Sequence, residues 1–334
     1  MTSAQENYVF GPVPSRRLGH SLGLDLVPYK TCSYDCVYCQ LGRTTELTVS
    51  RKRYVPIRDI LDQLWKKLGE GVVADYITLS GSGEPTLNSD ISELIDSIKK
   101  RTDIPVAVLT NGSLLWQRDV QQAILRADVV LPSLDAGDAD VFRRINRPHP
   151  DVVFEKMVEG LAEFRRVYRG EIWLEVLLVN DVNSEPSHIA QIKRHVDVIR
   201  PDTVQLNTVV RPSAEDFAKS VPSAVMLRAK QMLGDRAEVI ADYDAACPTE
   251  AASLAREEVV ALLRRRPCTL EDMVTGLSVH RNELVKHLTI LEQQGLVQKV
   301  ERDNRVYYQI GAAPAMDDSS GIVARGGKES EGQS

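Results

Sequence analysis

Long apolar runs are missing from this sequence, and none approaches the roughly 20 residues that a membrane-spanning helix needs. The N-terminal stretch MTSAQENYVFG also lacks the basic and apolar segments of a secretory signal. We therefore expect a cytoplasmic protein with no membrane partner, in a compartment where thiols stay reduced. The five cysteines are an odd number, which argues against a disulfide framework. Two of them, Cys247 and Cys268, are isolated and are expected to be small buried hydrophobes.

The sequence has no excess of positive charge. Its 41 Lys and Arg residues face 47 Asp and Glu, which gives a formal net charge of −6. A basic field is what draws a protein to nucleic acid, so any such contact here would have to be local. The 334 residues, 43% hydrophobic and 26% charged, are ordinary for a globular protein. They suit one large domain with a small one, or two medium domains.

Three cysteines lie close together within TCSYDCVYCQLGRTT. Cys32, Cys36 and Cys39 have C-x3-C-x2-C spacing, short enough for one loop to aim all three sulfurs at one point. Three thiolates can hold three irons of a [4Fe–4S] cluster, whose usual complement is four cysteines, and leave one iron open to a small molecule. The alternatives are a zinc site or three unrelated cysteines. Zinc sites usually gather four ligands in paired clusters, and no second C-x2-C or H-x3-H lies downstream.

This stretch resembles the signature of the radical S-adenosylmethionine (SAM) superfamily, including an aromatic residue, here Tyr38, immediately before the third cysteine. The resemblance implies that Cys32, Cys36 and Cys39 hold a [4Fe–4S] cluster whose open iron takes the amino and carboxylate groups of SAM. It also implies reductive cleavage of SAM to methionine and a 5′-deoxyadenosyl radical. An electron donor such as flavodoxin or ferredoxin would then be a partner.

A second motif, SGSGEPTL, directly follows a predicted strand. Its glycines allow a close approach of the backbone to a ligand, whereas a phosphate loop would need a Gly-Lys-Ser/Thr ending that is absent. The motif resembles the glycine–glutamate motif that binds the SAM amino group in the superfamily. The resemblance implies this role for Ser82, Gly83 and Glu84, with Ser82 where many members have glycine.

Apolar periodicity predicts strands that alternate with helices. The strands are expected at 21–26, 76–79, 106–109, 129–134, 172–179 and 203–207. The helices are expected at 57–68, 90–100, 118–125, 152–168, 185–199 and 224–233. This order indicates βαβ units, an α/β fold with a parallel sheet, and a partial (β/α)6 barrel with ligands at the carboxyl ends of the strands. The radical SAM core, which the chain resembles over roughly residues 18–235, implies the same architecture. The Gly- and Pro-rich FGPVPSRRLGH before it is expected to be mostly loop.

Polar residues follow the third and fourth predicted strands. Asn111 belongs to an Asn-Gly pair, which is either a turn or part of the SAM pocket. Ser133 and Asp135 are similar to the serine–aspartate stretch that superfamily members place near SAM. The alternative for both residues is the cap of a helix.

The last two strands carry further candidates. Glu175 stands among apolar residues, and a charge that faces a barrel interior is costly unless it is paired or used. A solvated Glu175 on the outer face is the alternative. Gln205 and Asn207 share one face of their strand and would read adenine or substrate if that face is internal. Arg211 is a candidate for a phosphate or carboxylate.

Two arginine-rich stretches have two interpretations each. Arg16 and Arg17 either clamp an anion near the cluster or form ion pairs with the body of the protein. The stretch RRINRPHP is either a site for an anionic substrate or a solvated loop. Its candidates are Arg143, Arg144, Asn146, Arg147 and His149.

The segment 251–310 differs from what precedes it. Helices are expected at 251–266, 270–276 and 279–294, followed by two short strands around Asp303-Asn304. This order resembles a winged helix-turn-helix, which would form a small domain after the core of residues 1–247. Because every predicted strand and SAM motif precedes residue 247, we expect the core to fold and cleave SAM alone. The Gly- and Ser-rich residues 311–334 are expected to be a disordered tail.

The charge of the predicted winged helix does not match DNA binding. Residues 251–310 contain nine Lys or Arg against eight Asp or Glu, whereas tight DNA binding needs several phosphate contacts. Docking of an RNA or protein substrate, of a partner, or of a second copy is an equal alternative. The polar and charged residues of the candidate recognition helix are His280, Arg281, Asn282, Glu283, Lys286, His287 and Glu292.

The whole chain resembles a group of radical SAM iron–sulfur oxidoreductases that carry FGPVPSRRLG before the cysteines and are related to the tRNA wybutosine-synthesizing enzymes. This kinship implies RNA modification, although a fold does not fix a substrate. Two alternatives remain, an iron–sulfur regulator whose winged helix reads DNA and a radical enzyme that modifies a peptide or protein. The regulator is disfavoured because SAM-binding motifs would have no purpose in it.

Overall fold

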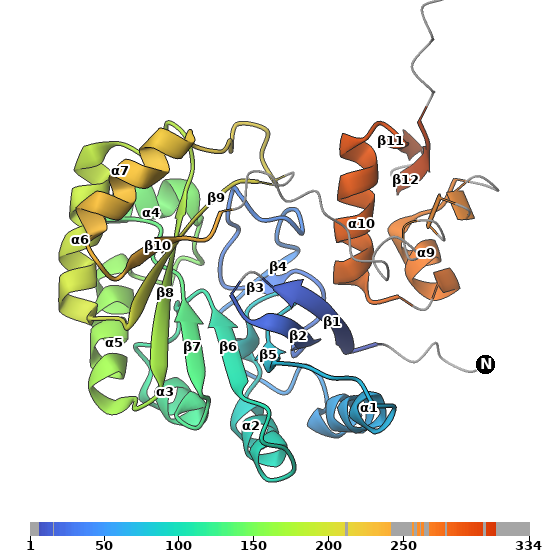
Figure 1. Cartoon of the computed structure of the whole chain (residues 1–334), viewed down its shortest axis with the longest axis horizontal. Coiled ribbons are helices and arrows are strands. Elements are labelled where there is room, and N and C mark those ends of the chain that lie inside the picture. Colours follow the sequence, from blue (N-terminus) through green and yellow to red (C-terminus); the bar gives the residue numbers. More distant parts are fainter. Residues whose placement is uncertain are drawn as a thin grey trace, which may run out of the picture.

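The computed structural model describes residues 7–15, 17–210, 213–241, 256, 259–260, 262–263, 267–277, 279–302 and 305–311. Most of this chain forms an α/β core around a curved sheet with the strand order β1-β2-β5-β6-β7-β8-β9-β10 (Figure 1). Neighbouring strands from β2 to β10 are parallel, and β1 is antiparallel to β2. The strands are β1 (Val9–Ser15), β2 (Gly19–Leu24), β5 (Tyr76–Leu79), β6 (Val106–Thr110), β7 (Val129–Pro132), β8 (Glu171–Leu178), β9 (Thr203–Thr208) and β10 (Ala237–Val239).

Helices connect the parallel strands and lie around the outer side of the sheet (Figure 1). Their buried residues recur every three or four positions, as an amphipathic helix on a sheet requires. A short 3-10 helix, η1 (Pro85–Leu87), follows β5. The α-helices of the core are α1 (Ile57–Gly69), α2 (Ile91–Lys99), α3 (Arg118–Ile124), α4 (Ala139–Ile145), α5 (Phe154–Val167), α6 (Pro186–Ile199) and α7 (Ser223–Leu233).

The two faces of the sheet differ, as strand β8 illustrates. Its residues 172, 174, 176 and 178 are fully buried in the main apolar core, whereas residues 173, 175 and 177 between them are half-buried and share the other face. Near the amino ends of the strands this inner face is closed by Leu18, which is buried against Ala107, Val129 and Leu131. Because apolar residues fill the amino ends, polar side chains of the inner face lie toward the carboxyl ends of the strands.

The predicted α/β fold and its six parallel strands are confirmed, but the structure differs from the expectations at three places. The FGPVPS stretch forms strand β1, and its ladder with β2 shifts register between Phe10 and Val13. Strand β10 was not predicted because three residues give no periodicity. Arg143 and Arg144 belong to helix α4 and not to a loop.

A C-terminal module follows, which we define as the described residues from 256 to 311. It contains α9 (Leu270–Leu277), α10 (Arg281–Gln293) and an antiparallel hairpin of β11 (Val297–Arg302) and β12 (Arg305–Ile310), as the sequence predicts. Cys268 is fully buried in its apolar cluster. Most of the predicted helix at 251–266, the turn at 303–304, the tail from 312, and the residues Arg16, Arg211 and Cys247 lie outside the described residues.

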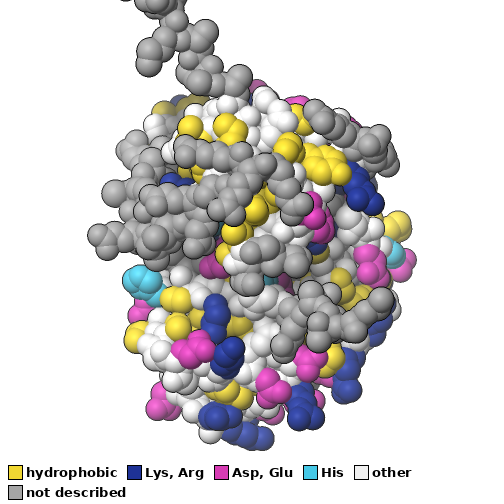
Figure 2. All heavy atoms as spheres, turned by 90° about the vertical axis from the view of Figure 1, so that its right-hand side faces the viewer, with side chains coloured by type: hydrophobic (Ala, Val, Ile, Leu, Met, Phe, Trp, Pro, Cys, Tyr) yellow, Lys and Arg dark blue, Asp and Glu magenta, His cyan; other side chains and the backbone are white. Residues whose placement is uncertain are grey.

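The module lies beside β1 and β2, with the start of α10 toward the core (Figure 1). Figure 2 shows the molecule from this side, and the described Lys and Arg side chains there are interspersed with Asp and Glu. None of the helices in the described part of the chain has the length and apolar character that a bilayer crossing requires.

Candidate active site at the cysteine loop

The three cysteines occupy one loop above the carboxyl ends of the strands. Cys32 ends the two-residue strand β3 (Thr31–Cys32), which pairs with β4 (Glu46–Leu47) and closes the loop. Within the loop, the Cys39 N–H donates to the Cys36 carbonyl at 3.1 Å. All three side chains are half-buried, so this loop keeps them at the edge of the core.

Each cysteine sulfur receives an N–H donor from a different side chain. Hydrogen bonds of this kind stabilise thiolate ligands and tune the potential of an iron–sulfur cluster. The donors are Lys30 Nζ to Cys39 Sγ at 3.1 Å, Asn111 Nδ2 to Cys32 Sγ at 3.5 Å, and Asn146 Nδ2 to Cys36 Sγ at 3.5 Å. The sequence singles out Asn111 and Asn146 but not Lys30, whose position just before the cysteine motif was the available signal.

Two of the three thiols have a raised pKa in this environment. Burial, followed by the charge of Glu84, raises the pKa of Cys32 to about 12, and burial together with the other two cysteines raises the pKa of Cys36 well above its usual range. Metal binding must therefore displace these protons. Among the described residues no group of three Cys, His, Asp or Glu side chains is arranged around a single metal ion. A [4Fe–4S] cluster places each thiolate on a different iron, so three separate sulfurs with N–H donors fit it.

The Ser82–Glu84 loop lies directly against the start of the cysteine loop. The Glu84 N–H donates to the Thr31 carbonyl at 3.1 Å, and the Lys30 N–H donates to the Ser82 carbonyl at 2.6 Å. Gly83 makes this approach possible, because a Cβ there would come within 1.8 Å of the Thr31 oxygen. The two predicted motifs are thus brought together.

The carboxylate of Glu84 is buried and joins the ends of two strands. Its Oε1 accepts from the Thr86 N–H at 3.1 Å, the Thr86 hydroxyl at 2.6 Å and the Thr110 hydroxyl at 2.7 Å, and its Oε2 accepts from the Asn111 N–H at 2.7 Å. Burial raises the pKa of Glu84, although these hydrogen bonds act to lower it. A carboxylate has about four lone-pair directions, so only Oε2 keeps room for a further donor.

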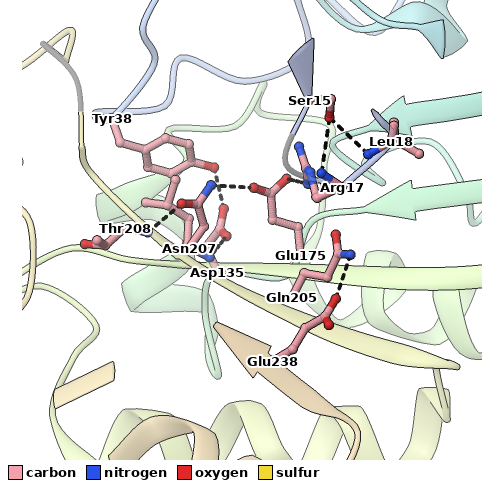
Figure 3. Close-up of polar contacts among 11 residues, drawn as sticks. Ser15, Arg17, Leu18, Tyr38, Asp135, Glu175, Gln205, Asn207, Thr208 and Glu238 are labelled. Carbon is pink, nitrogen blue, oxygen red and sulfur yellow. Dashed lines mark hydrogen bonds and ion pairs between the residues drawn. The ribbon is translucent and has the colours of Figure 1, made fainter. Parts of the chain in front are cut away.

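Asp135 anchors the cysteine loop to the sheet (Figure 3). Its Oδ2 accepts from the Tyr38 hydroxyl at 2.5 Å and from Asn146 Nδ2 at 2.8 Å, and its Oδ1 accepts from the Leu177 N–H at 2.9 Å. Burial raises the pKa of Asp135 to about 6 despite these bonds. Ser133 lies just before it, at the end of β7, and its backbone pairs with that of Glu175.

Glu175 points to the inner side of the sheet, so the solvated alternative is wrong. Arg17 Nη1 lies 2.9 Å from its Oε2, and Asn207 Nδ2 donates to its Oε1 at 3.1 Å (Figure 3). Arg17 therefore forms an ion pair with the body of the protein. Gln205 lies on the same face and donates to Glu238 Oε1 at 3.0 Å. The sequence missed Glu238 because strand β10 was not predicted.

The stretch RRINRPHP does not gather into one anion site. Arg143 pairs with Asp140 on the surface of α4. Arg147 Nη1 lies 2.6 Å from Glu215 Oε1, which also pairs with Arg43 at 2.8 Å. Arg143 and Arg147 thus pair with carboxylates of the chain itself.

Comparison with known proteins agrees with this geometry. Residues 26–191 match the model of the Radical SAM superfamily. A UPF0026 protein of Methanocaldococcus jannaschii, MJ1312, is 32% identical over 306 residues, which are 90% of this chain and 94% of that protein. The chain belongs to the UPF0026 family. The superfamily uses a [4Fe–4S] cluster and SAM, and the residues described above fit both.

Other similarities of this UPF0026 chain are broader. A protein of Brachyspira hyodysenteriae named GTPase Obg is 40% identical over 87% of this chain, but the chain spans only 43% of that protein. A radical SAM methyltransferase from Sphaerobacter thermophilus has the same fold, with a TM-score of 0.55, 16% identity and 68% of each chain covered. The structure of TYW1 with a lysine-pyruvate adduct has a TM-score of 0.50 and 18% identity, and covers 65% of this chain and 74% of that one.

Proposed function

We propose that this protein is a radical SAM enzyme that modifies RNA and holds its [4Fe–4S] cluster with Cys32, Cys36 and Cys39. One observation carries the proposal: each cysteine sulfur has its own N–H donor at the edge of the sheet where the Ser82–Glu84 loop also lies. Bound there, cluster and SAM supply reductive cleavage to methionine and a 5′-deoxyadenosyl radical.

The residues of the chain bind and orient these groups. Lys30, Asn111 and Asn146 stabilise the thiolates, since charged and amide N–H donors favour the ionised form of sulfur. Asp135 fixes the loop through Tyr38. Asn111 follows strand β6, Asp135 follows β7 and Asn146 ends helix α4, so the cysteine loop is held from several sides.

SAM binds beside the loop in this proposal. Glu84 receives its amino group on Oε2, the oxygen that accepts only one hydrogen bond from the described residues. Gly83 lets the loop that carries Glu84 pack against Thr31 at the start of the cysteine loop. Ser133, Asp135, Glu175 and Asn207 lie next along the strand ends and contact SAM or the substrate.

The cluster assignment is tested by anaerobic purification and reconstitution. Wild-type protein should hold about four irons and four sulfides per chain. Cys36→Ala should lose the cluster, while Cys268→Ala, which changes a cysteine inside the C-terminal module, should keep it. A full content of iron and sulfide in Cys36→Ala would refute the assignment of the cluster to these three cysteines.

RNA as substrate is supported by the resemblance of the chain's motifs to those of the tRNA wybutosine-synthesizing enzymes and by the C-terminal module, which we interpret as a winged helix. The test compares the nucleosides of RNA from a deletion strain that carries wild-type protein, Cys36→Ala or nothing. A modified nucleoside present only with the wild type is expected. A modification that is found only in a peptide or protein would show that the substrate is a polypeptide and not RNA.

The regulator hypothesis is disfavoured by the placement of helix α10. DNA-reading helices present their N-terminal residues to base edges. Here Glu283 Oε1 accepts from the Gly11 N–H at 3.1 Å, and His280 contacts Asp25 at 2.5 Å. The end of the helix that would read DNA is bound to the core.

A further inference from the structure

Asp25 is a buried carboxylate between the core and the C-terminal module. It directly follows strand β2 and is 5% exposed. Its Oδ1 accepts from the Ser82 N–H and its Oδ2 from the Ser82 hydroxyl at 2.9 Å. On the other side, His280 Nε2 lies 2.5 Å from Oδ2. One carboxylate thus joins the Ser82–Glu84 loop to the module.

The side chain of His280 is fixed in this position. It is 3% exposed and caps helix α10, because its Nδ1 accepts from the Asn282 N–H at 3.1 Å. A ring nitrogen that accepts leaves the proton on the other nitrogen, so Nε2 donates to Asp25. The ring also stacks on Phe10 of strand β1, with centroids 4.3 Å apart.

The backbone next to Ser82 is tightly packed between Asp25 and the start of helix α10. Gly81 has φ +125°, and a Cβ there would lie 1.9 Å from Asp25 Oδ1 and 3.3 Å from Asn282 Nδ2. The loop, the carboxylate and the start of α10 are therefore in direct contact. A shift of one of them must move the others.

The same loop contacts the cysteine loop on its opposite side. The Ser82 carbonyl accepts from the Lys30 N–H, and the Glu84 N–H donates to the Thr31 carbonyl. A continuous path of hydrogen bonds therefore leads from His280 through Asp25 and Ser82 to the residues that precede Cys32.

We propose that Asp25 and His280 are positioning residues through which the C-terminal module holds the SAM-binding loop in place. This inference rests on the proposed function. Without His280 the buried carboxylate of Asp25 loses its partner in the module. The Ser82–Glu84 loop then loses a contact that fixes its position. The module then acts on SAM affinity through the loop and without touching SAM.

The test is SAM binding to reconstituted full-length protein by calorimetry, with iron content measured on the same samples. His280→Ala should weaken SAM binding about tenfold while iron stays at the wild-type value, since a hydrogen bond to a charged group is lost. His280→Gln, which keeps an N–H donor, should recover part of the affinity. His287→Ala on the same helix, in the surroundings of Arg256 and Lys286, is the matched control and should bind SAM as the wild type does.

A second readout separates this inference from the proposed function. Hydrogen–deuterium exchange without SAM should be faster across residues 80–84 in His280→Ala and in Asp25→Asn, because the Ser82 N–H donates to Asp25. The double variant should exchange no faster than either single variant. Unchanged exchange and unchanged affinity in a fully loaded His280→Ala protein would overturn the coupling. If wild-type protein binds no SAM but the variants still exchange faster at residues 80–84, the proposed SAM function is refuted. The coupling between the module and the loop then stands.

Discussion

The hydroxyl of Tyr38 lies 2.5 Å from the buried carboxylate of Asp135, so the aromatic residue of the cysteine motif is tied to the end of strand β7. Cys36 and Cys39 flank Tyr38 closely in the sequence. The orientation of the loop that carries them therefore depends on a contact with a strand nearly a hundred residues away.

Tyr38→Phe should reduce both stability and cluster retention. It removes one donor from a buried carboxylate, which costs about 1–3 kcal/mol, although Asn146 and Leu177 still donate to Asp135. We expect lower iron content after exposure to air and a lower midpoint of thermal unfolding. Tyr54→Phe is the control, because the Tyr54 hydroxyl donates to the Ser50 carbonyl at the surface. Equal behaviour of the two variants would show that the Asp135 contact is dispensable.

Two variants separate support of the loop from direct binding of SAM at Glu84. Glu84→Gln keeps an oxygen acceptor but removes the charge, and should weaken SAM binding about tenfold or more. Thr110→Val removes one hydrogen bond to Glu84 and keeps the charge, so it should cost about 1 kcal/mol of stability and leave SAM affinity unchanged. Both are measured by SAM titration and thermal unfolding. If Thr110→Val weakens binding as much as Glu84→Gln does, Glu84 acts through the loop only.

The pair of Arg17 and Glu175 should behave as one unit. Arg17→Ala removes the cation 2.9 Å from the half-buried Glu175 carboxylate, and should destabilise the fold by about 1–3 kcal/mol. Adding Glu175→Gln removes the carboxylate that pairs with Arg17, so this change should cost less stability in Arg17→Ala than in the wild type. Urea unfolding of the wild type, Arg17→Ala, Glu175→Gln and the double variant gives the coupling free energy between the two residues. Simple additivity would mean that the ion pair contributes nothing.

The C-terminal module should lose stability on acidification because of His287. Burial, with the charges of Arg256 and Lys286, lowers the pKa of His287 below its ordinary value, and its Nδ1 has no hydrogen-bond partner among the described residues. The unfolded chain then binds the proton more readily than the folded chain. Stability is complete above the ordinary pKa of about 6.5 and falls as the pH drops toward the lower folded value. His287→Gln should flatten this part of the unfolding curve between pH 7 and 5.5, and an unchanged slope would assign the effect to other groups.

The sequence predicted strands β2 and β5 to β9 and most of the helices between them because each carries a local signal. Alternating or continuous apolar residues are enough to place β8 or α5, and the cysteine and glycine motifs lie at strand ends by topology. Strand β1 has no such signal, since its Gly-Pro interrupts the pattern and its pairing depends on the ring of Phe10 over Gly23, where a Cβ would approach to 2.0 Å.

Contacts between distant residues could not be predicted from local pattern. Asp25 belongs to SLGLDL and reads as the polar position of a strand, and His280 reads as a residue of a recognition helix. Only the fold brings these two side chains together. The expectation that the core works without the module stays a prediction, and the Asp25–His280 contact favours weaker SAM binding after removal of residues 251–334.

Reductive cleavage of SAM by the reconstituted protein tests the central claim most directly. Anaerobic protein is reduced with dithionite in the presence of SAM, and 5′-deoxyadenosine and methionine are measured over time. We expect both products from the wild type, none from Cys32→Ala, Cys36→Ala or Cys39→Ala, and wild-type amounts from Cys268→Ala. Absence of 5′-deoxyadenosine from wild-type protein that holds four irons per chain would contradict the account.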